Sequence, residues 1–402
     1  MNLSAFIARR YFLSLKSSNA VNIITGISVL GIMVGTAALI IVLSAFNGLE
    51  DLVRGFYRDF DPDLKISSVE GKYFNPQEIV PAMAGFKSDF SATAFSLEEK
   101  ALVSFEEQEY IATLKGTEAA FTAVNDVEQN IIKGQFEIGS GPGGSEAVLG
   151  AGVAYFLRFN EYDLGSDLQI FVPGEAEGLD LNQAYSSRGL RPAGIFSIQP
   201  EFDEQYIITD LDFVRDLLER PRAVSSLEIK VKDYSNIDRI QEDLQAALPP
   251  GFKILNRDQQ QAVFFKVMKS EGLFTFLVFA LILGIGTLTV AGSLTMLMFE
   301  KRQNLHSLFN MGMTLSRMRR IFYFEGLTIS GVGGLSGLVL GVLIVWLQQK
   351  FHLLYMGDGY VVEAYPVELR WRDVALVALT VFVLSISVSW LTAQRLNEKL
   401  WR

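Results

Sequence analysis

Long stretches without a charged side chain divide the sequence into apolar segments around one polar block. They cover residues 17–49, 272–299, 326–349 and 374–394. Each reaches the roughly 20 residues that a helix needs to cross a hydrocarbon core of ~30 Å. A charged side chain at mid-bilayer costs about 2.5–3.5 kcal/mol on insertion scales, so such lengths without charge indicate membrane spans. The pattern predicts an α-helical membrane protein with four transmembrane helices, one before and three after the polar block.

The polar block mixes the periodicities of strands and helices. Short segments of apolar and β-branched residues, many of them alternating with polar ones, predict strands at 64–67, 101–105, 109–114, 168–172, 193–198, 206–209 and 226–231. Apolar residues at helical spacing predict helices at 211–218 and 237–248. The block is therefore predicted to be a large α+β domain between helices one and two, outside the cytoplasm. Its acidic, Gly-containing segment Pro173–Pro192 is either a solvated surface loop or a projecting hairpin that grips a partner.

Basic residues beside the apolar segments set the expected orientation. They cluster at Arg9, Arg10, Lys16, Lys301, Arg302, Arg317, Arg319, Arg320, Arg395, Lys399 and Arg402. These residues lie before the first span, between the second and third spans, and after the fourth span. Because positive residues mark the cytoplasmic side, these three regions are predicted to be cytoplasmic. The predicted order is a cytoplasmic amphipathic helix at 1–20, transmembrane helix one at 21–46, the extracytoplasmic domain at 47–271, transmembrane helix two at 272–299, a cytoplasmic loop at 300–320, transmembrane helix three at 321–349, a periplasmic loop at 350–372, transmembrane helix four at 373–394 and a cytoplasmic tail at 395–402.

Charge is distributed unevenly between these parts. Residues 47–271 carry 38 acidic and 21 basic side chains, whereas the remaining residues carry 7 acidic and 14 basic ones, which gives the net charge of −10 for the 402 residues. A nucleic-acid-binding domain needs a positive surface, so nucleic acid is not an expected partner. The acidity either keeps the domain soluble or attracts a basic soluble partner.

The sequence carries no recognisable catalytic or metal-binding pattern. It has no cysteine, and its two histidines, His306 and His352, lack the spacing of metal ligands. Neither a Walker A loop nor a nucleophile elbow is present. The chain is therefore predicted to be non-enzymatic, and any energy source must come from another chain.

Small residues recur at four-residue spacing in two apolar segments. Gly31 and Gly35 lie in the first, and Gly333, Gly337 and Gly341 lie in the third. This spacing favours close helix–helix packing in lipid, either within the chain or at a dimer interface. Glu325, beside the third segment, is predicted either to lie near the headgroups or to be buried with a basic partner.

The loop between helices two and three contains a second amphipathic pattern. Leu305, Leu308, Phe309 and Gly312 recur at helical spacing between charged residues. Such a short helix either lies flat in the membrane interface or inserts its exposed face into a groove of a soluble protein.

Several short motifs make the chain similar to a known family. They are Phe6-Ile7-Ala8-Arg9-Arg10-Tyr11, Ile27-Ser28-Val29-Leu30-Gly31-Ile32, Val42-Leu43-Ser44-Ala45-Phe46-Asn47-Gly48, Phe265-Lys266-Val267-Met268-Lys269, Glu300-Lys301, Met311-Gly312-Met313, Glu325-Gly326, Tyr365-Pro366-Val367 and Ala393-Gln394-Arg395-Leu396. The chain resembles the lipoprotein-releasing LolC and LolE permeases, which belong to the type VII ABC transporter family together with MacB and FtsX.

The resemblance implies a permease in the bacterial inner membrane. It would pair with a second copy or a paralogue and bind a cytoplasmic ABC ATPase dimer, which would hold ATP and Mg, while this chain itself would hold no cofactor. Nucleotide-driven motion would pass to the periplasmic domain. The residues implied for coupling to the ATPase are Arg302, Leu305, Leu308, Phe309, Met311 and Gly312.

The cargo implied by the resemblance is a lipoprotein, extracted among membrane lipids and passed to a periplasmic lipoprotein carrier. Its acyl chains are expected at a mouth formed by Phe46, Phe274, Phe276 and Phe279, and the carrier at Glu175, Glu177 and Asp180. Two other functions remain open, namely export of the MacB type and control of a cell-wall hydrolase of the FtsX type.

Overall fold

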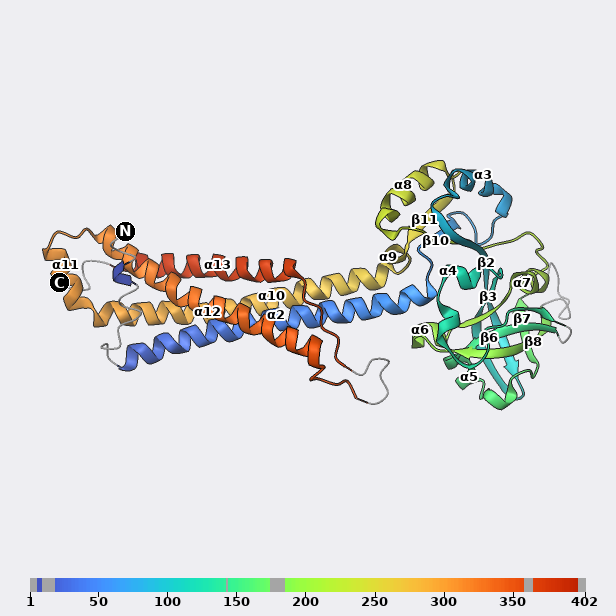
Figure 1. Cartoon of the computed structure of the whole chain (residues 1–402), viewed down its shortest axis with the longest axis horizontal. Coiled ribbons are helices and arrows are strands. Elements are labelled where there is room, and N and C mark those ends of the chain that lie inside the picture. Colours follow the sequence, from blue (N-terminus) through green and yellow to red (C-terminus); the bar gives the residue numbers. More distant parts are fainter. Residues whose placement is uncertain (1–5, 9–18, 142–143, 174–184, 358–363, 397–402) are drawn as a thin grey trace. The chain divides into compact units, whose positions relative to one another are not determined.

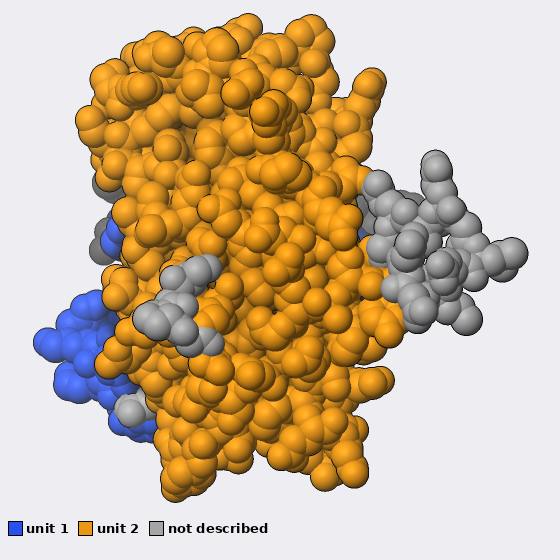
Figure 2. Space-filling view, turned by 90° about the vertical axis from the view of Figure 1, so that its right-hand side faces the viewer, with its two compact units in different colours: residues 1–52, 266–402 blue, residues 53–265 orange. Residues whose placement is uncertain are grey.

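The computed structural model describes residues 6–8, 19–141, 144–173, 185–357 and 364–396. The chain divides into two compact units, shown in different colours in Figure 2. Residues 1–52 and 266–402 form the first unit, and residues 53–265 form the second. One boundary between the units falls inside the long helix α2 (Asn19–Phe60). The other falls near the start of the long helix α10 (Ala262–Glu300), and both helices are labelled in Figure 1.

The first unit is a bundle of long apolar helices. Besides parts of α2 and α10 it contains α12 (Leu315–Phe351), α13 (Trp371–Gln394) and the short α11 (Arg302–Asn310). Among the described residues, four helices are long and apolar enough to cross a membrane, namely α2, α10, α12 and α13. The predicted arrangement of one helix before the polar block and three after it is confirmed.

The helices run further than the apolar segments that revealed them. α2 continues past residue 46 to Phe60, α10 begins at Ala262 before the predicted start at 272, and α12 begins at Leu315 before 321. Charged residues end an apolar span without ending a helix, and no proline interrupts these extensions. Hydropathy therefore predicts the spans but underestimates the helices.

Glycines bring α12 and α2 into close contact within the chain. A Cβ atom added at Gly333, Gly337 or Gly341 would lie 2.8, 2.5 or 3.1 Å from a backbone oxygen of α2. On the other side, a Cβ at Gly35 of α2 would lie 3.1 Å from the Leu283 side chain of α10. The prediction of close helix packing is confirmed, and the glycines of α12 are used inside the bundle.

We predict that Gly337→Ala destabilises the bundle by about 1–3 kcal/mol, because the added methyl group forces the backbones of α12 and α2 apart. Gly331→Ala on the same helix is the matched control, since a Cβ there meets nothing within 4 Å. Thermal unfolding of the two purified variants in detergent measures the difference. Equal melting temperatures would show that the contact between these helices is not needed.

Glu325 is enclosed by the same bundle. It lies on the buried face of α12 and is 2% exposed. Its Oε2 atom has no hydrogen-bond partner among the described residues. The predicted burial is confirmed, whereas a basic partner for Glu325 is not found among the contacts of the described residues, and its depth relative to the headgroups stays a prediction.

The second unit is built on one mixed sheet. Its strands are β1 (Leu64–Ser68), β2 (Phe90–Phe105), β3 (Gln108–Thr117), β4 (Ile131–Gly134), β5 (Gly139–Gly141), β6 (Gly144–Gly150), β7 (Leu168–Pro173), β8 (Tyr185–Phe196), β9 (Tyr206–Asp210), β10 (Ser226–Val231) and β11 (Phe252–Asn256). In the described residues the order is β11-β1-β10-β2-β3-β9-β6-β8-β4, while β5 pairs with β6 and β7 pairs with β2 and β8.

Short helices cover this sheet (Figure 1). They are α3 (Val80–Met83), α4 (Phe121–Val124), α5 (Ala151–Phe156), α6 (Pro200–Asp203), α7 (Leu211–Leu217), α8 (Ile237–Ala247) and α9 (Arg257–Gln260). The predicted helices at 211–218 and 237–248 correspond to α7 and α8. With this sheet, the predicted α+β domain between helices one and two is confirmed.

Two predicted connections have different outcomes. The hairpin expected from 101–105 and 109–114 is present as β2 and β3, whose last pair is Phe105 with Gln108. Of the two alternatives for Pro173–Pro192, the solvated loop is wrong in extent, since β8 begins at Tyr185 and pairs with β7 up to Pro173. The hairpin is present, and its grip on a partner stays a prediction. The predicted strand 193–198 corresponds to the end of β8, and the part over 185–192 was missed because Gly189 and Pro192, which usually weaken strands, lie within it. The result is a β-hairpin whose tip, residues 174–184, lies outside the described residues.

A charged cluster lies inside the second unit. Lys115 of β3 is 1% exposed, and its Nζ atom lies 2.7 Å from Glu228 of β10 and 3.7 Å from Glu98 of β2. Lys65 of β1 lies 3.1 Å from Glu98. Burial alone would raise the pKa of Glu98, but Lys65 and Lys115 outweigh it and lower that pKa to about 2. The cluster joins four neighbouring strands, β1, β10, β2 and β3.

Candidate functional site

The helix α11 is held against the bundle by one of its faces. Leu305 is fully buried in an apolar cluster with Met298 of α10, Phe322 of α12 and Ala393 of α13. Leu308 packs against the same cluster from the side. The amphipathic helix expected here is present, and its apolar stripe fixes it to the three spanning helices.

The remaining predicted coupling residues lie at the surface. Arg302 is exposed, the Phe309 side chain is 37% exposed, and Met311 is 73% exposed. Gly312 adopts a left-handed conformation, with φ of 90°, which lets the chain turn from α11 toward α12. Leu305 is buried inside the protein, where it positions α11, and its predicted role in coupling to the ATPase stays a prediction. The contact with the ATPase predicted for Arg302, Phe309 and Met311 stays a prediction.

The predicted phenylalanine mouth is only partly open. Phe46 of α2 covers Gly272 of α10, where an added Cβ would lie 3.0 Å from its ring. Phe276 and Phe279 pack against the core of the bundle, whereas Phe274 is 68% exposed. Phe46 thus joins α2 to α10, and of the residues predicted on α10 only Phe274 presents most of its surface outward.

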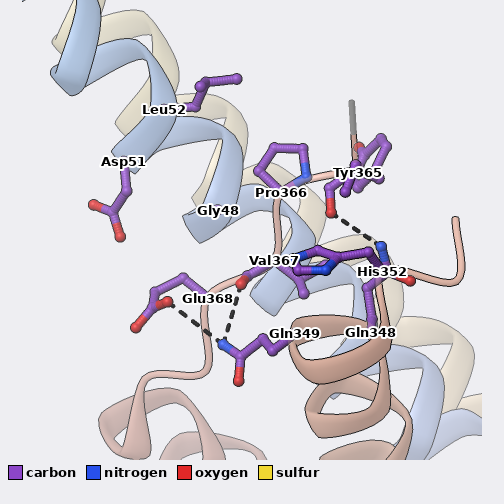
Figure 3. Close-up of a pocket in the computed structure, with 11 residues that line it drawn as sticks. Gly48, Asp51, Leu52, Gln348, Gln349, His352, Tyr365, Pro366, Val367 and Glu368 are labelled. Atoms are coloured by element: carbon purple, nitrogen blue, oxygen red, sulfur yellow. Dashed lines mark hydrogen bonds between the residues drawn. The ribbon is translucent and has the colours of Figure 1, made fainter. Parts of the chain in front are cut away.

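A cavity of about 570 Å³ lies at the end of the bundle opposite α11. Gly48, Asp51 and Leu52 of α2 line one side, and the last turn of α12 with residues 364–368 lines the other (Figure 3). Gln349 of α12 donates to the Val367 carbonyl oxygen at 3.1 Å. Gln348 donates to the carbonyl oxygens of Leu354 and Tyr365 at 3.1 and 3.2 Å. These bonds fix the segment that leads from α12 to α13.

The same segment is also tied to α2 by polar contacts beside the cavity. Asn47 donates to Asp373 at 2.6 Å, and Arg370 donates to Glu50 and Asp51 at 2.9 and 2.8 Å. The sequence analysis missed these contacts. The available signal was the presence of opposite charges immediately after the first span and before the fourth, which places them at the same membrane surface.

The described residues offer no evident catalytic or metal centre. Within the described ranges, no group of three or more His, Asp or Glu side chains could hold a metal ion. The carrier-binding residues predicted at Glu175, Glu177 and Asp180 lie outside the described residues.

In the described part of the chain, four spanning helices, one before and three after a large α+β unit, define a polytopic membrane protein. Residues 25–247 match the MacB-like periplasmic core domain, and residues 276–399 match the FtsX-like permease C-terminal domain. The chain belongs to the family of FtsX-like ABC transporter permeases with a MacB-like periplasmic core domain. It is a multi-pass inner-membrane protein and a non-catalytic transmembrane subunit, whose work requires a partner ATPase.

Individual relatives extend over nearly the whole chain. The chain is 22% identical to the "Lipoprotein-releasing system transmembrane protein LolC" of Neisseria meningitidis serogroup B, over 99% of this chain and 97% of the relative. It is 23% identical to the corresponding LolE protein of Haemophilus influenzae, over 98% and 97%. A solved structure, the periplasmic region of MacB from Actinobacillus actinomycetemcomitans, is 14% identical and covers 52% of this chain and 94% of its own, with a TM-score of 0.36.

Proposed function

We propose that this chain couples ATP hydrolysis in a cytoplasmic ABC ATPase to the release of lipoproteins from the outer leaflet of the inner membrane. The observation that carries the proposal is the end-to-end similarity to relatives named as parts of the lipoprotein-releasing system, which covers both the periplasmic domain and the helix bundle. The released lipoprotein passes to a soluble periplasmic carrier. A second copy of this chain or a paralogue completes the permease.

The surface helix α11 is the proposed contact with the ATPase. Its buried residue Leu305 anchors it to α10, α12 and α13, so a push on α11 reaches three spanning helices at once. Phe309 and Met311, with Arg302 at the rim, form the contact surface. ATP and Mg are bound by the ATPase and not by this chain.

The contact between α2 and α10 is the proposed site for the acyl chains. Burial of an acyl chain in the membrane is worth about 0.8 kcal/mol per CH₂, so extraction needs both energy and an apolar place to hold the chain. Phe274 supplies exposed apolar surface there, and Phe46, which covers Gly272, would have to move to widen the gap. Phe276 and Phe279 support the wall from the bundle side, and membrane lipids fill the gap between cycles.

Depletion of this chain in its native cell tests the proposal. We expect lipoproteins destined for the outer membrane to accumulate in the inner membrane, as measured by separating the two membranes and blotting for one such lipoprotein. A wild-type copy restores sorting, and an empty plasmid is the control. Normal lipoprotein sorting with lost resistance to an exported compound would instead favour the MacB-type function. Normal sorting with unseparated cells would favour the FtsX-type function.

A further inference from the structure

Residues 366–368, in the described part of the connection between α12 and α13, lie directly on the backbone of α2. A Cβ atom added at Gly48 would lie 2.5 Å from the carbonyl group of Pro366 and from the nitrogen of Val367. One residue further, the Glu368 amide donates to the Ser44 carbonyl oxygen at 2.8 Å. This approach leaves no room for a side chain at position 48, so glycine is required there for steric reasons.

Polar side chains extend this contact along one face of α2. Asn47 reaches Asp373 in the first turn of α13, and Asp51 reaches Arg370 just before that helix. Together with Ser44 and Gly48 these positions are spaced by three or four residues, so they form a single stripe on α2. Glu50, beside the stripe, takes the second arm of the Arg370 guanidinium. The stripe and its partners, which we call the α2 tie, lie next to the cavity of Figure 3.

The far end of the connection is anchored to α12. Gln348 is 5% exposed and uses both ends of its amide, since Nε2 donates to Leu354 and Tyr365 and Oε1 accepts from the Leu354 amide. Gln349 adds a bond to the Val367 carbonyl oxygen. The connection is thus fixed to α12 through glutamines and to α2 through the tie, so the ends of three helices are joined.

The tie contributes more to geometry than to stability. The Arg370 side chain is 37% exposed and its partners Glu50 and Asp51 are 21% and 45% exposed. Exposed ion pairs are worth about 0–1 kcal/mol each, so these pairs are not what holds the bundle together. A guanidinium that bridges two carboxylates does, however, fix direction, because its planar fork holds two donors in a set geometry.

We infer that Arg370 is a positioning residue that locks α12 and α13 to α2, so that their displacement moves α2. The inference rests on the proposed function, in which α11 receives the push of the ATPase at the other end of α12. α2 runs unbroken from Asn19 to Phe60, so the helix that carries the tie also supplies residues 53–60 of the second unit. The glycine contacts between α12 and α2 do not involve Arg370, so its loss frees the Glu50–Asp51 part of α2 from α13 and leaves the rest of the bundle packed.

Arg370→Ala in the complete permease–ATPase complex tests the inference. We expect ATP hydrolysis to stay near the wild-type rate, while lipoprotein released per ATP falls about tenfold, within the coupling range of allosteric proteins. Arg372→Ala, an exposed arginine two residues further on, is the matched control and should behave as wild type. A merely structural role of Arg370 would instead lower the melting temperature and both activities together.

A cross-link between α2 and α13 tests whether the defect of Arg370→Ala can be reversed. The chain has no cysteine, so Asn47→Cys with Asp373→Cys can be joined by a short bifunctional thiol reagent in the Arg370→Ala background. Cross-linking should restore release per ATP. Release per ATP that is unchanged by Arg370→Ala, or that is not recovered after verified cross-linking, would overturn the inference.

A readout that needs no cargo separates this inference from the proposed function. A fluorescent label on Val69→Cys, a 62% exposed position in the second unit, should respond to ATP in the wild-type complex and lose its response in Arg370→Ala. If that pattern is found but the wild-type complex releases no lipoprotein, the proposed function fails while the tie stands. A wild-type complex whose label ignores ATP contradicts the inference itself.

Discussion

Replacing Lys115 with methionine is expected to lower the free energy of unfolding of the second unit by about 3–5 kcal/mol, because it leaves a buried carboxylate without its cation. Glu228 is fully buried, and the Lys115 ammonium lies 2.7 Å from its Oε1 atom. Its Oε2 atom has no hydrogen-bond partner among the described residues. Glu98 keeps Lys65 in the variant, so the loss concentrates on Glu228.

The matched control removes both charges. Lys115→Met with Glu228→Leu replaces the pair by apolar groups of similar volume, which is often neutral for stability. The Lys115 ammonium also lies 4.8 Å from the centre of the Phe60 ring, and a methionine side chain preserves much of that packing. Urea-dependent proteolysis of the full-length protein, followed through a fragment of the second unit, measures the difference. A double variant as unstable as the single one would contradict the explanation.

Introducing a charge at the exposed end of α11 is expected to abolish coupling without unfolding the permease. Met311 is 73% exposed, so an aspartate there is solvated in the free permease. If the ATPase covers this position, the aspartate becomes buried without a partner, which costs about 2–5 kcal/mol or more at an interface. Met311→Asp should therefore lower stimulation of ATP hydrolysis and lipoprotein release by about tenfold or more, since 1.4 kcal/mol corresponds to a factor of ten.

Two further variants serve as controls for Met311→Asp, one at an exposed position and one at a buried position. Ser316→Asp places the same charge on the exposed start of α12 and should leave coupling near the wild-type level. Leu305→Asp places it at a fully buried position and should destabilise the permease itself, with loss of expression. Normal ATPase binding and stimulation by the Met311→Asp variant would show that α11 does not form the contact.

The predicted coupling segment shows where a sequence pattern is sufficient and where it is ambiguous. Spacing alone predicted a short helix that contains Leu305 and Leu308, and α11 is that helix. Periodicity identifies an apolar face but does not say what covers it. The cluster with Met298, Phe322 and Ala393 decides this for Leu305, since residues from three distant parts of the chain meet there.

For the glycines, too, the sequence pattern predicted one property and left another open. Their spacing predicted close packing but left open whether the partner helix belonged to the same chain. The distances from Gly333, Gly337 and Gly341 to α2 identify the partner as a helix of the same chain. Similarly, Gly189 and Pro192 give the segment 185–192 a weak local preference for a strand, so the sequence did not predict one there. The strand forms because residues 185–190 pair with β7, which overrides that preference.

The sequence by itself determined the number of spanning helices, their order around the polar domain, and the family, because hydropathy and short motifs are local properties of consecutive residues. Only the tertiary structure decided that Lys115 is enclosed with Glu228 and that Arg370 meets Glu50 and Asp51. Each of these contacts joins residues more than a hundred positions apart. Their energies depend on burial and distance, which no local pattern contains.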